Sequence, residues 1–193
     1  MKKLVVASNN KGKLKEIKAI LGGIYEVVPM ADLSYKVDVE ETGATFYENA
    51  LIKAKTVSKA LNVDALADDS GICVTALNGA PGVYSARYSG GHGNDKDNNN
   101  LLLKNLNGKE DRSAKFVSSI VLYTVNDEIF EGYGETHGTI LFEEDGVNGF
   151  GYDPLFFSTD LNKSFGIASD EEKNSVSHRY RALCNLVEKL GDK

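Results

Sequence analysis

Ala67-Asp68-Asp69-Ser70-Gly71 places two adjacent carboxylates between the apolar runs 63–67 and 72–76. The two runs predict two strands, and the glycine-containing segment predicts a tight turn where the first strand ends. Successive side chains of a strand point to opposite faces, so at most one of the two aspartates faces any one site. The stretch alone has two interpretations: a carboxylate aimed at a cation or a water, or the commoner solvated turn whose aspartates cap backbone amides.

The length and composition predict one domain, or one domain with two lobes, spanning 1–193. An apolar fraction of 41% is enough for a sizeable core, and a net charge of −6 argues against a nucleic-acid-binding protein, which presents a basic face. Cys73 and Cys184 are too few for a disulfide framework. The first apolar run, 4–7, is too short for a signal peptide, and no run reaches membrane-span length. We therefore expect a soluble protein of the reducing cytoplasm, with no membrane or nucleic-acid partner.

A polar, glycine-containing loop follows the first predicted strand, 4–7, and opens a helix that runs to about Leu21. Such a helix start suits an anion, because its unpaired amides point outward and its dipole favours negative charge. The loop is neither a P-loop nor a dinucleotide-binding motif, and a solvated helix start is an equally good interpretation. Its residues are Ser8, Asn9, Asn10, Lys11, Gly12 and Lys13.

The capping-box pattern Thr45-Phe46-Tyr47-Glu48 predicts a second helix, to about Leu61, after a strand at 25–30 and a loop at 31–43. Lys53 shares one face of this helix with Asn49, four residues before it. Taken alone, Lys53 is typical of a surface lysine. Glu40 and Glu41 precede the helix start, where acidic residues are favoured in any case.

Two glycine-rich loops are predicted in the second half, at 78–91 and 146–154. Long ordered loops in compact domains are often functional. The second loop alternates glycines with Phe150 and Tyr152, a pattern that suits stacking on a base or, equally, an aromatic-anchored turn. Between the loops, 94–106 predicts a helix with a poor Asn/Asp-rich start.

The remaining segments complete a mixed architecture. The imperfectly alternating run 113–125 and the alternating run 128–139 predict a long antiparallel hairpin, followed by a strand ending near 142 and another at 155–157. A second capping box at Ser169 starts a short helix that carries Lys173. His178 and Arg179 open the last helix, where the macrodipole disfavours cations, which is mild support for a functional reason. Strand–helix units followed by hairpins predict an α/β fold with a mixed sheet.

The polar candidates together predict a nucleotide hydrolase. Basic groups suit a polyphosphate, acidic groups suit a hard cation such as Mg²⁺ shared with phosphate oxygens, and aromatic rings suit a planar base. The three histidines lie in unrelated contexts, which gives no Ser/His/Asp arrangement, and no Cys/His spacing fits zinc. Cys73 sits in an apolar strand and is expected to be packed in the core rather than to act as a nucleophile.

Six motifs, in order along nearly the whole chain, resemble those of the non-canonical purine nucleoside triphosphate pyrophosphatases, also called inosine triphosphate pyrophosphatases. They are Ser8 to Lys13; Glu41-Thr42-Gly43 with 46–50; 67–71; 79–90; Phe150 to Pro154; and Glu172-Lys173 followed by Ser177-His178-Arg179. The resemblance implies an elongated, two-lobed α/β fold around a long mixed β-sheet flanked by helices. It places the active-site cleft between the lobes and implies a homodimer. It also implies Mg²⁺-dependent hydrolysis of dITP, ITP and XTP to the monophosphate and pyrophosphate.

The resemblance also implies roles for individual residues. Asp69 falls on the general base, which is also a metal ligand, and Glu41 on a second metal ligand, with the adjacent Glu40 as an alternative. Asn9 stands where many members have glycine, and Asn tolerates the left-handed backbone better than most residues. The substrate-binding positions fall on Ser8, Asn9, Asn10, Lys11, Gly12, Lys13, Ser70, Phe150, Gly151, Tyr152, Asp153, Lys173, His178 and Arg179.

The expected mechanism adds three assignments. Lys53, with Lys13, is expected to bind substrate by stabilising the leaving pyrophosphate. His178 or Arg179 is expected to donate a hydrogen bond to the 6-oxo group of the purine, which adenine lacks. Strand alternation turns Asp68 away from Asp69, so we expect a local structural role for it.

Two other functions remain open at this level. One is a pyrophosphatase that removes pyrimidine or other modified nucleotides, and the other is a nucleotide-binding regulator without catalysis. A nucleic-acid-binding module is a weaker alternative because of the acidic composition.

Overall fold

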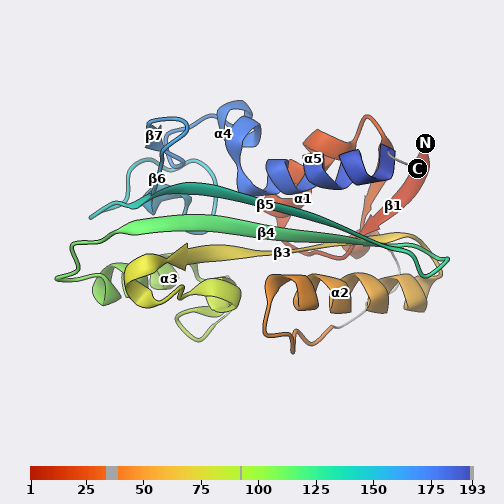
Figure 1. Ribbon diagram of the computed structural model, residues 1–193, viewed down its shortest axis with the longest axis horizontal. Coiled ribbons are helices and arrows are strands. Elements are labelled where there is room, and N and C mark those ends of the chain that lie inside the picture. Colours follow the sequence, from red (N-terminus) through yellow and green to blue (C-terminus); the bar gives the residue numbers. More distant parts are fainter. Residues whose placement is uncertain (34–38, 92, 192–193) are drawn as a thin grey trace. The chain divides into compact units, whose positions relative to one another are not determined.

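The computed structural model describes residues 1–33, 39–91 and 93–191, and it is an α/β protein (Figure 1). Within those residues a mixed sheet has seven strands in the order β2-β1-β3-β4-β5-β6-β7, flanked by helices. The strands are β1 Lys2–Val6, β2 Tyr25–Pro29, β3 Ala65–Val74, β4 Ser113–Tyr123, β5 Ile129–Ile140, β6 Phe156–Ser158 and β7 Lys163–Ser164. The α-helices are α1 Lys11–Leu21, α2 Phe46–Leu61, α3 Asp95–Asn105, α4 Asp170–Val176 and α5 His178–Gly191. Short 3₁₀ helices are η1 Met30–Asp32, η2 Thr75–Leu77, η3 Gly82–Arg87 and η4 Asp153–Leu155.

Part of the predicted loop 31–43, namely 34–38, and His92 lie outside the described residues. In the part of the chain that the structure describes, no helix combines the length and apolar character that crossing a membrane requires.

The chain divides into two compact units, which share the long strands β3, β4 and β5. Unit 1 consists of Met1–Asp69, Ser118–Gly134 and Arg179–Lys193. Unit 2 consists of Ser70–Val117 and Glu135–His178. The boundary on β3 falls directly after Asp69, so the acidic pair belongs to unit 1 and Ser70 to unit 2.

Unit 1 is a sheet with a hydrophobic cluster on each face. β1 pairs in parallel with β2 and with β3, as expected for strand–helix units. Figure 1 shows α1 and α5 on one face of this sheet and α2 on the other. Side chains alternate between the two clusters along each strand: Leu66 packs in the α1 and α5 cluster, whereas Ala65 and Ala67 pack in the α2 cluster. This alternation fixes where each aspartate of β3 points.

The predicted turn at Asp68–Gly71 is wrong, because β3 continues unbroken through these residues to Val74. Gly71 is needed for a close approach instead. A Cβ at this position would lie 2.4 Å from the carbonyl oxygen of Gly82 and 2.4 Å from Ser85 Oγ. That hydroxyl also accepts a hydrogen bond from the Ile72 amide at 2.9 Å. The glycine therefore lets a neighbouring segment of unit 2 lie against the strand.

Gly71→Ala is expected to lower the free energy of unfolding by about 1–3 kcal/mol, because the added methyl group meets backbone that must shift. Urea unfolding followed by circular dichroism measures the change. Gly23→Ala is the matched control, since a Cβ there meets nothing within 4 Å. Equal stabilities of the two variants would show that the close approach at Gly71 is unimportant.

The two predicted capping boxes and the predicted hairpin are confirmed. Both capping boxes form, at Thr45 for α2 and at Ser169 for α4. The hairpin of β4 and β5 closes through the Thr124 amide, which donates to the Glu128 carbonyl at 3.0 Å. The sequence prediction did not include β7, because two residues are too few to show a strand pattern.

Candidate functional site

Asp69 is buried on the α2 face of the unit 1 sheet, with 6% of its surface exposed. The α2 helix supplies two donors to its carboxylate. Asn49 Nδ2 donates to Oδ2 at 3.2 Å, and Lys53 Nζ donates to Oδ1 at 3.2 Å. Asn49 and Lys53 lie four residues apart, so the helix presents both on one face. Lys53 is therefore part of the site and not an ordinary surface lysine.

Glu41 joins this cluster from the segment before α2. Its Oε1 lies 3.2 Å from Lys53 Nζ, whereas Glu40 is exposed. The segment is tied to the helix because the Gly43 amide donates to Asn49 Oδ1 at 2.8 Å. The Asn49 side chain thus connects the Glu41 segment with Asp69. Of the two candidate acids, the geometry favours Glu41.

Burial and charge act in opposite directions on Asp69. Burial raises the pKa of Asp69, and the nearby ammonium groups of Lys53 and Lys13 only partly offset it. Burial also acts to lower the pKa of Lys53, but the Asp69 and Glu41 carboxylates prevail and raise it. The cluster thus pairs a carboxylate of raised proton affinity with a lysine that stays charged.

Asp68 points to the other face of the same strand, as the alternation predicts. Its Oδ2 lies 3.0 Å from Lys13 Nζ and accepts bonds from Arg179 Nε at 3.1 Å and Nη2 at 2.9 Å. Its Oδ1 accepts from Ser118 Oγ at 2.5 Å. Arg179 Nη1 in turn pairs with the carboxylate of Glu16 on α1. These five residues, Asp68, Arg179, Glu16, Lys13 and Ser118, form a buried ion-pair cluster.

The charges in this cluster shift one another strongly. Burial acts to raise the pKa of Asp68, but Arg179 and Lys13 outweigh it and hold that pKa far below its usual range. Burial acts to lower the pKa of Arg179, whereas Asp68 and Glu16 raise it above its usual range. Asp68 therefore has a structural role, as predicted: its carboxylate links β3 to α5 through Arg179 and to α1 through Lys13.

Two lysines converge on the backbone of Asp68. Its carbonyl oxygen lies 3.0 Å from Lys53 Nζ and 3.4 Å from Lys13 Nζ. Burial lowers the pKa of Lys13, partly offset by Asp68. The two ammonium groups therefore come from opposite faces of the sheet to one point on β3, where each also pairs with a carboxylate.

The first turn of α1 is organised by its own side chains. Asn10 caps the helix by accepting from the Lys13 amide at 3.1 Å, and Ser8 Oγ accepts from the Asn10 amide at 3.2 Å. Asn9 and Lys11 are exposed, and Gly12 is half-buried. The left-handed backbone considered for Asn9 is not observed, since the described non-glycine residues with positive φ are Asn62, Asn78, Asp127 and Asn162.

Unit 2 brings together a second set of predicted residues around Asp153. Its Oδ2 accepts from the Phe150 amide at 2.8 Å and from Lys173 Nζ at 2.6 Å. Lys173 Nζ also lies 4.6 Å from the centre of the Phe150 ring. Asp153 and Lys173 are both buried, whereas Phe150 is half-buried. Phe150 is thus the aromatic ring of this set that a planar ligand can reach.

Tyr152 and His178 are both buried in unit 2. Tyr152 is 5% exposed, and its hydroxyl donates to the Ser85 carbonyl at 2.7 Å. The His178 ring stacks on Phe116, with centres 4.8 Å apart and planes 13° apart. Of the two aromatic candidates for stacking, Tyr152 serves as an anchor for the loop. Ser70, at the start of unit 2, is half-buried on β3 beside Asp69.

The donor set fits a magnesium ion. Among the described residues, no group of three or more His, Cys, Asp or Glu side chains forms a ready metal cage. Asp69 and Glu41 nevertheless offer two carboxylates that approach one cation, the Lys53 ammonium. Mg²⁺ is commonly bound by one or two carboxylates, with water and substrate phosphates completing its shell.

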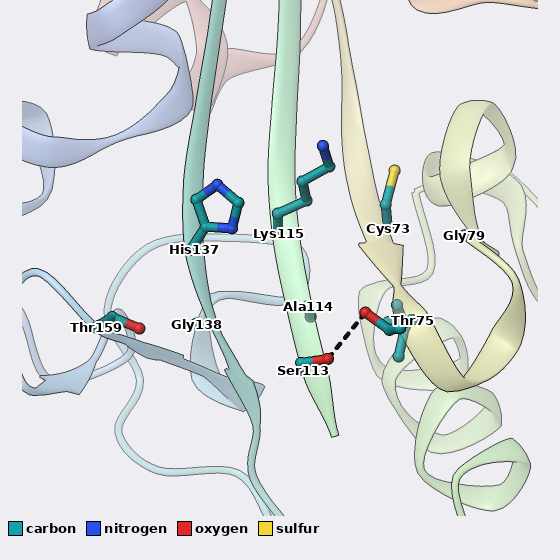
Figure 2. Close-up of a pocket in the computed structure, with 10 residues that line it drawn as sticks. Cys73, Thr75, Gly79, Ser113, Ala114, Lys115, His137, Gly138 and Thr159 are labelled. Atoms are coloured by element: carbon teal, nitrogen blue, oxygen red, sulfur yellow. Dashed lines mark hydrogen bonds between the residues drawn. The ribbon is translucent and has the colours of Figure 1, made fainter. Parts of the chain in front are cut away.

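A separate hollow of unit 2 contains none of the predicted site residues (Figure 2). It has a volume of about 460 Å³, and its lining includes Cys73, Lys115 and His137 from three strands. Cys73 is half-buried there, so the expectation that it is packed in the core is wrong. Burial raises the pKa of its thiol, which makes it a poor nucleophile at neutral pH.

Several residues that surround Asp68 and Asp69 in unit 1, or contact the loop of Asp153 in unit 2, were not predicted from the sequence as site residues. Asn49 was visible only as a residue four positions from Lys53. Glu16 and Ser118 gave no signal, because their partners lie far away in the chain. Asp95 and Asn99 on α3 also gave no signal, although both bond to Gly151 in the glycine-rich loop 146–154, which we call the aromatic loop.

The chain is similar to known proteins of one family over nearly its whole length. The Ham1 family model matches residues 4–189. A dITP/XTP pyrophosphatase of Staphylococcus epidermidis is 46% identical over 190 residues, covering 98% of this chain and 97% of its own. One of Haemophilus influenzae is 48% identical, covering 97% and 98%. The structure of the Staphylococcus aureus Ham1 protein matches with a TM-score of 0.89 and 44% identity over the whole of both chains. The chain belongs to the Ham1 family.

Proposed function

We propose that this protein hydrolyses the non-canonical purine nucleoside triphosphates dITP, ITP and XTP to the monophosphate and pyrophosphate, and so removes them from the nucleotide pool. The observation that carries the proposal is the unit 1 site, where Asp69 and Glu41 meet Lys53 and where two lysines converge on Asp68. The relatives named dITP/XTP pyrophosphatase, at up to 48% identity among those compared, support the substrate class.

Asp69 and Glu41 are the residues that would hold Mg²⁺. When bound there, the ion supplies charge neutralisation on the phosphate oxygens. Asp69 also orients the attacking water and accepts its proton, a role that suits a carboxylate whose pKa burial has raised. Asn49 keeps the Asp69 carboxylate in place through its bond to Oδ2.

We place the attack at the α-phosphorus, which gives the monophosphate and pyrophosphate. Water adds to the α-phosphorus, the bond to the bridging oxygen of the β-phosphate breaks, and the electron pair leaves with pyrophosphate. Lys13, Lys53 and the first amides of α1 stabilise the charge on that leaving group. Both ammonium groups lie at the Asp68 carbonyl, directly beside Asp69 on β3.

We assign the purine to the unit 2 residues. Phe150 provides the stacking face, and the Asp153–Lys173 pair fixes the loop that carries it. The sequence left the donor to the 6-oxo group open between His178 and Arg179. Because the Arg179 guanidinium pairs with Asp68 and Glu16, we assign that role to His178.

His178→Phe tests this assignment, because it keeps the ring stacked on Phe116 but removes the donor. The ratio of kcat/KM for ITP over ATP is expected to fall about 10- to 100-fold, as for loss of one specificity-determining hydrogen bond. Steady-state pyrophosphate release from each nucleotide measures it. An unchanged ratio would move the selectivity to another donor, with Lys173 the next candidate.

The proposed reaction is tested by measuring pyrophosphate and orthophosphate released from ITP with and without Mg²⁺. We expect stoichiometric pyrophosphate, no orthophosphate, and no turnover after chelation. Orthophosphate as the first product would contradict attack at the α-phosphorus. Faster turnover of dUTP or dTTP than of ITP and XTP would favour the pyrimidine alternative, and tight binding without turnover would favour a regulator.

We further propose that the protein acts in the cytoplasm as a homodimer, as its resemblance to the pyrophosphatases implies. Light scattering coupled to gel filtration tests the assembly. A mass near the 20.9 kDa of one chain at micromolar concentration would contradict it.

A further inference from the structure

Gly151, beside Phe150 in the aromatic loop, has both of its backbone polar groups bound by one helix. Its amide donates to Asp95 Oδ2 at 2.8 Å, and its carbonyl accepts from Asn99 Nδ2 at 3.2 Å. Asp95 and Asn99 lie four residues apart and share one face of α3. Gly151 has φ +61°, a conformation that few residues other than glycine adopt readily. The helix thus fixes an unusual backbone conformation next to the stacking ring.

Packing alone does not account for asparagine at position 99. The residue is 3% exposed, and its Nδ2 also donates to Glu144 Oε1 at 2.9 Å. Its Oδ1 is buried and has no hydrogen-bond partner among the described residues. An apolar side chain would avoid the cost of that unsatisfied acceptor. The bonds made by Nδ2 are therefore what this side chain contributes.

The same helix supports the other glycine-rich loop of unit 2. Asn98 Oδ1 accepts from the amide and the hydroxyl of Ser89, each at 2.8 Å. The two loops are also joined directly, since the Tyr152 hydroxyl bonds to the Ser85 carbonyl. The Asn/Asp-rich start of α3, which looks poor for a helix, is explained by these contacts.

We propose that Asp95 and Asn99 are positioning residues for purine recognition. They act through Gly151, whose fixed backbone sets the direction of the Phe150 ring, and neither is among the residues assigned to the phosphates or to the reacting water. The inference rests on the proposed function, because it concerns how tightly and how selectively the base is held. It predicts effects on KM and on selectivity, with kcat largely kept.

The test compares Asp95→Ala, Asn99→Ala and the double variant with the wild type. KM for ITP is expected to rise about tenfold in the double variant, and the ITP-over-ATP ratio of kcat/KM to fall, as expected for the loss of the two hydrogen bonds to Gly151, each of modest net strength. Asp97→Ala is the matched control: it removes the same charge from the same helix turn, but Asp97 bonds to Asn94. Asp95→Asn keeps an acceptor for the Gly151 amide and is expected to restore the wild-type KM.

A merely structural role would lower the melting temperature without changing the ratio between nucleotides. If Asn99→Ala does not fold, the exposed Asp95 carries the test. An unchanged KM and ratio in Asp95→Ala, relative to Asp97→Ala, would overturn the inference.

Failure of the proposed function is recognised separately. If the wild type releases no pyrophosphate from ITP, the proposed function fails, and binding of inosine monophosphate is measured by calorimetry instead. Weaker binding by Asp95→Ala than by Asp97→Ala would still support the inference. Equal binding, or none by the wild type, would overturn it.

Discussion

Asp69→Asn is expected to fold as the wild type does and to lose ITP turnover by about 10²- to 10⁴-fold, the usual contribution of a positioned general base. The amide keeps the size of the side chain but can neither accept the proton of the attacking water nor neutralise a cation. The loss should appear in kcat at saturating ITP. Pyrophosphate release measures it, with circular dichroism and the melting temperature as checks on folding.

Asp127→Asn is the matched control for this substitution. Asp127 is a unit 1 aspartate with φ +65°, a conformation that asparagine also tolerates, and its partners are the exposed Lys59 and the buried Tyr123. Its turnover should equal that of the wild type. If Asp69→Asn kept full turnover, the assignment of the base would be wrong.

Glu41→Gln separates the ligand role from the base role. Its turnover should recover as the Mg²⁺ concentration rises, whereas that of Asp69→Asn should not, because the base is still missing. Recovery of both variants would reduce Asp69 to a metal ligand.

The second large effect is on stability: Asp68→Asn is expected to lower the free energy of unfolding by about 3–5 kcal/mol, the usual cost of removing one partner from a buried ion pair. Arg179, 1% exposed, would keep Glu16 but lose the carboxylate that binds its Nε and Nη2. Urea unfolding at neutral pH measures the change. A difference under about 0.5 kcal/mol would contradict the role of the cluster, since that is the range of ordinary surface substitutions.

The pH dependence gives an independent check. The pKa of Asp68 is lower in the folded than in the unfolded chain, where it is about 3.9, so the unfolded state binds more protons on acidification. Its stabilising contribution is complete above about pH 4–5 and is lost as the pH falls towards the depressed folded pKa. Asp68→Asn should therefore flatten the acid limb of the stability curve.

Two further variants locate the effect within the cluster. Ser118→Ala removes one bond to Asp68 and should cost about 1–3 kcal/mol, less than loss of the charge. The double variant Asp68→Asn, Arg179→Met should be less destabilised than the sum of its single variants, because it leaves no unpaired guanidinium.

Local patterns were sufficient for much of the secondary structure. The capping boxes at Thr45 and Ser169, the apolar period of α1 and the run of Val, Ile, Phe and Tyr in β4 each extend over a few residues, so they can be read from the local sequence. Even the separation of Asp68 from Asp69 follows from the two-residue period of a strand. Glycine was misread at Gly71, because a close approach by Gly82 and Ser85 looks like a turn when their positions are unknown.

The sequence by itself determined the α/β architecture, the two capped helices and the opposite directions of Asp68 and Asp69, since these depend on periodicity and on contacts within one turn. The tertiary structure decided which residues the Asp68 and Asp69 side chains contact. Lys53 forms ion pairs with Asp69 and Glu41, and Arg179 forms an ion pair with Asp68, 111 residues away in the chain. These ion pairs depend on which distant segments are buried together and on the charges that they carry. A short sequence pattern contains no information on which distant segments come into contact.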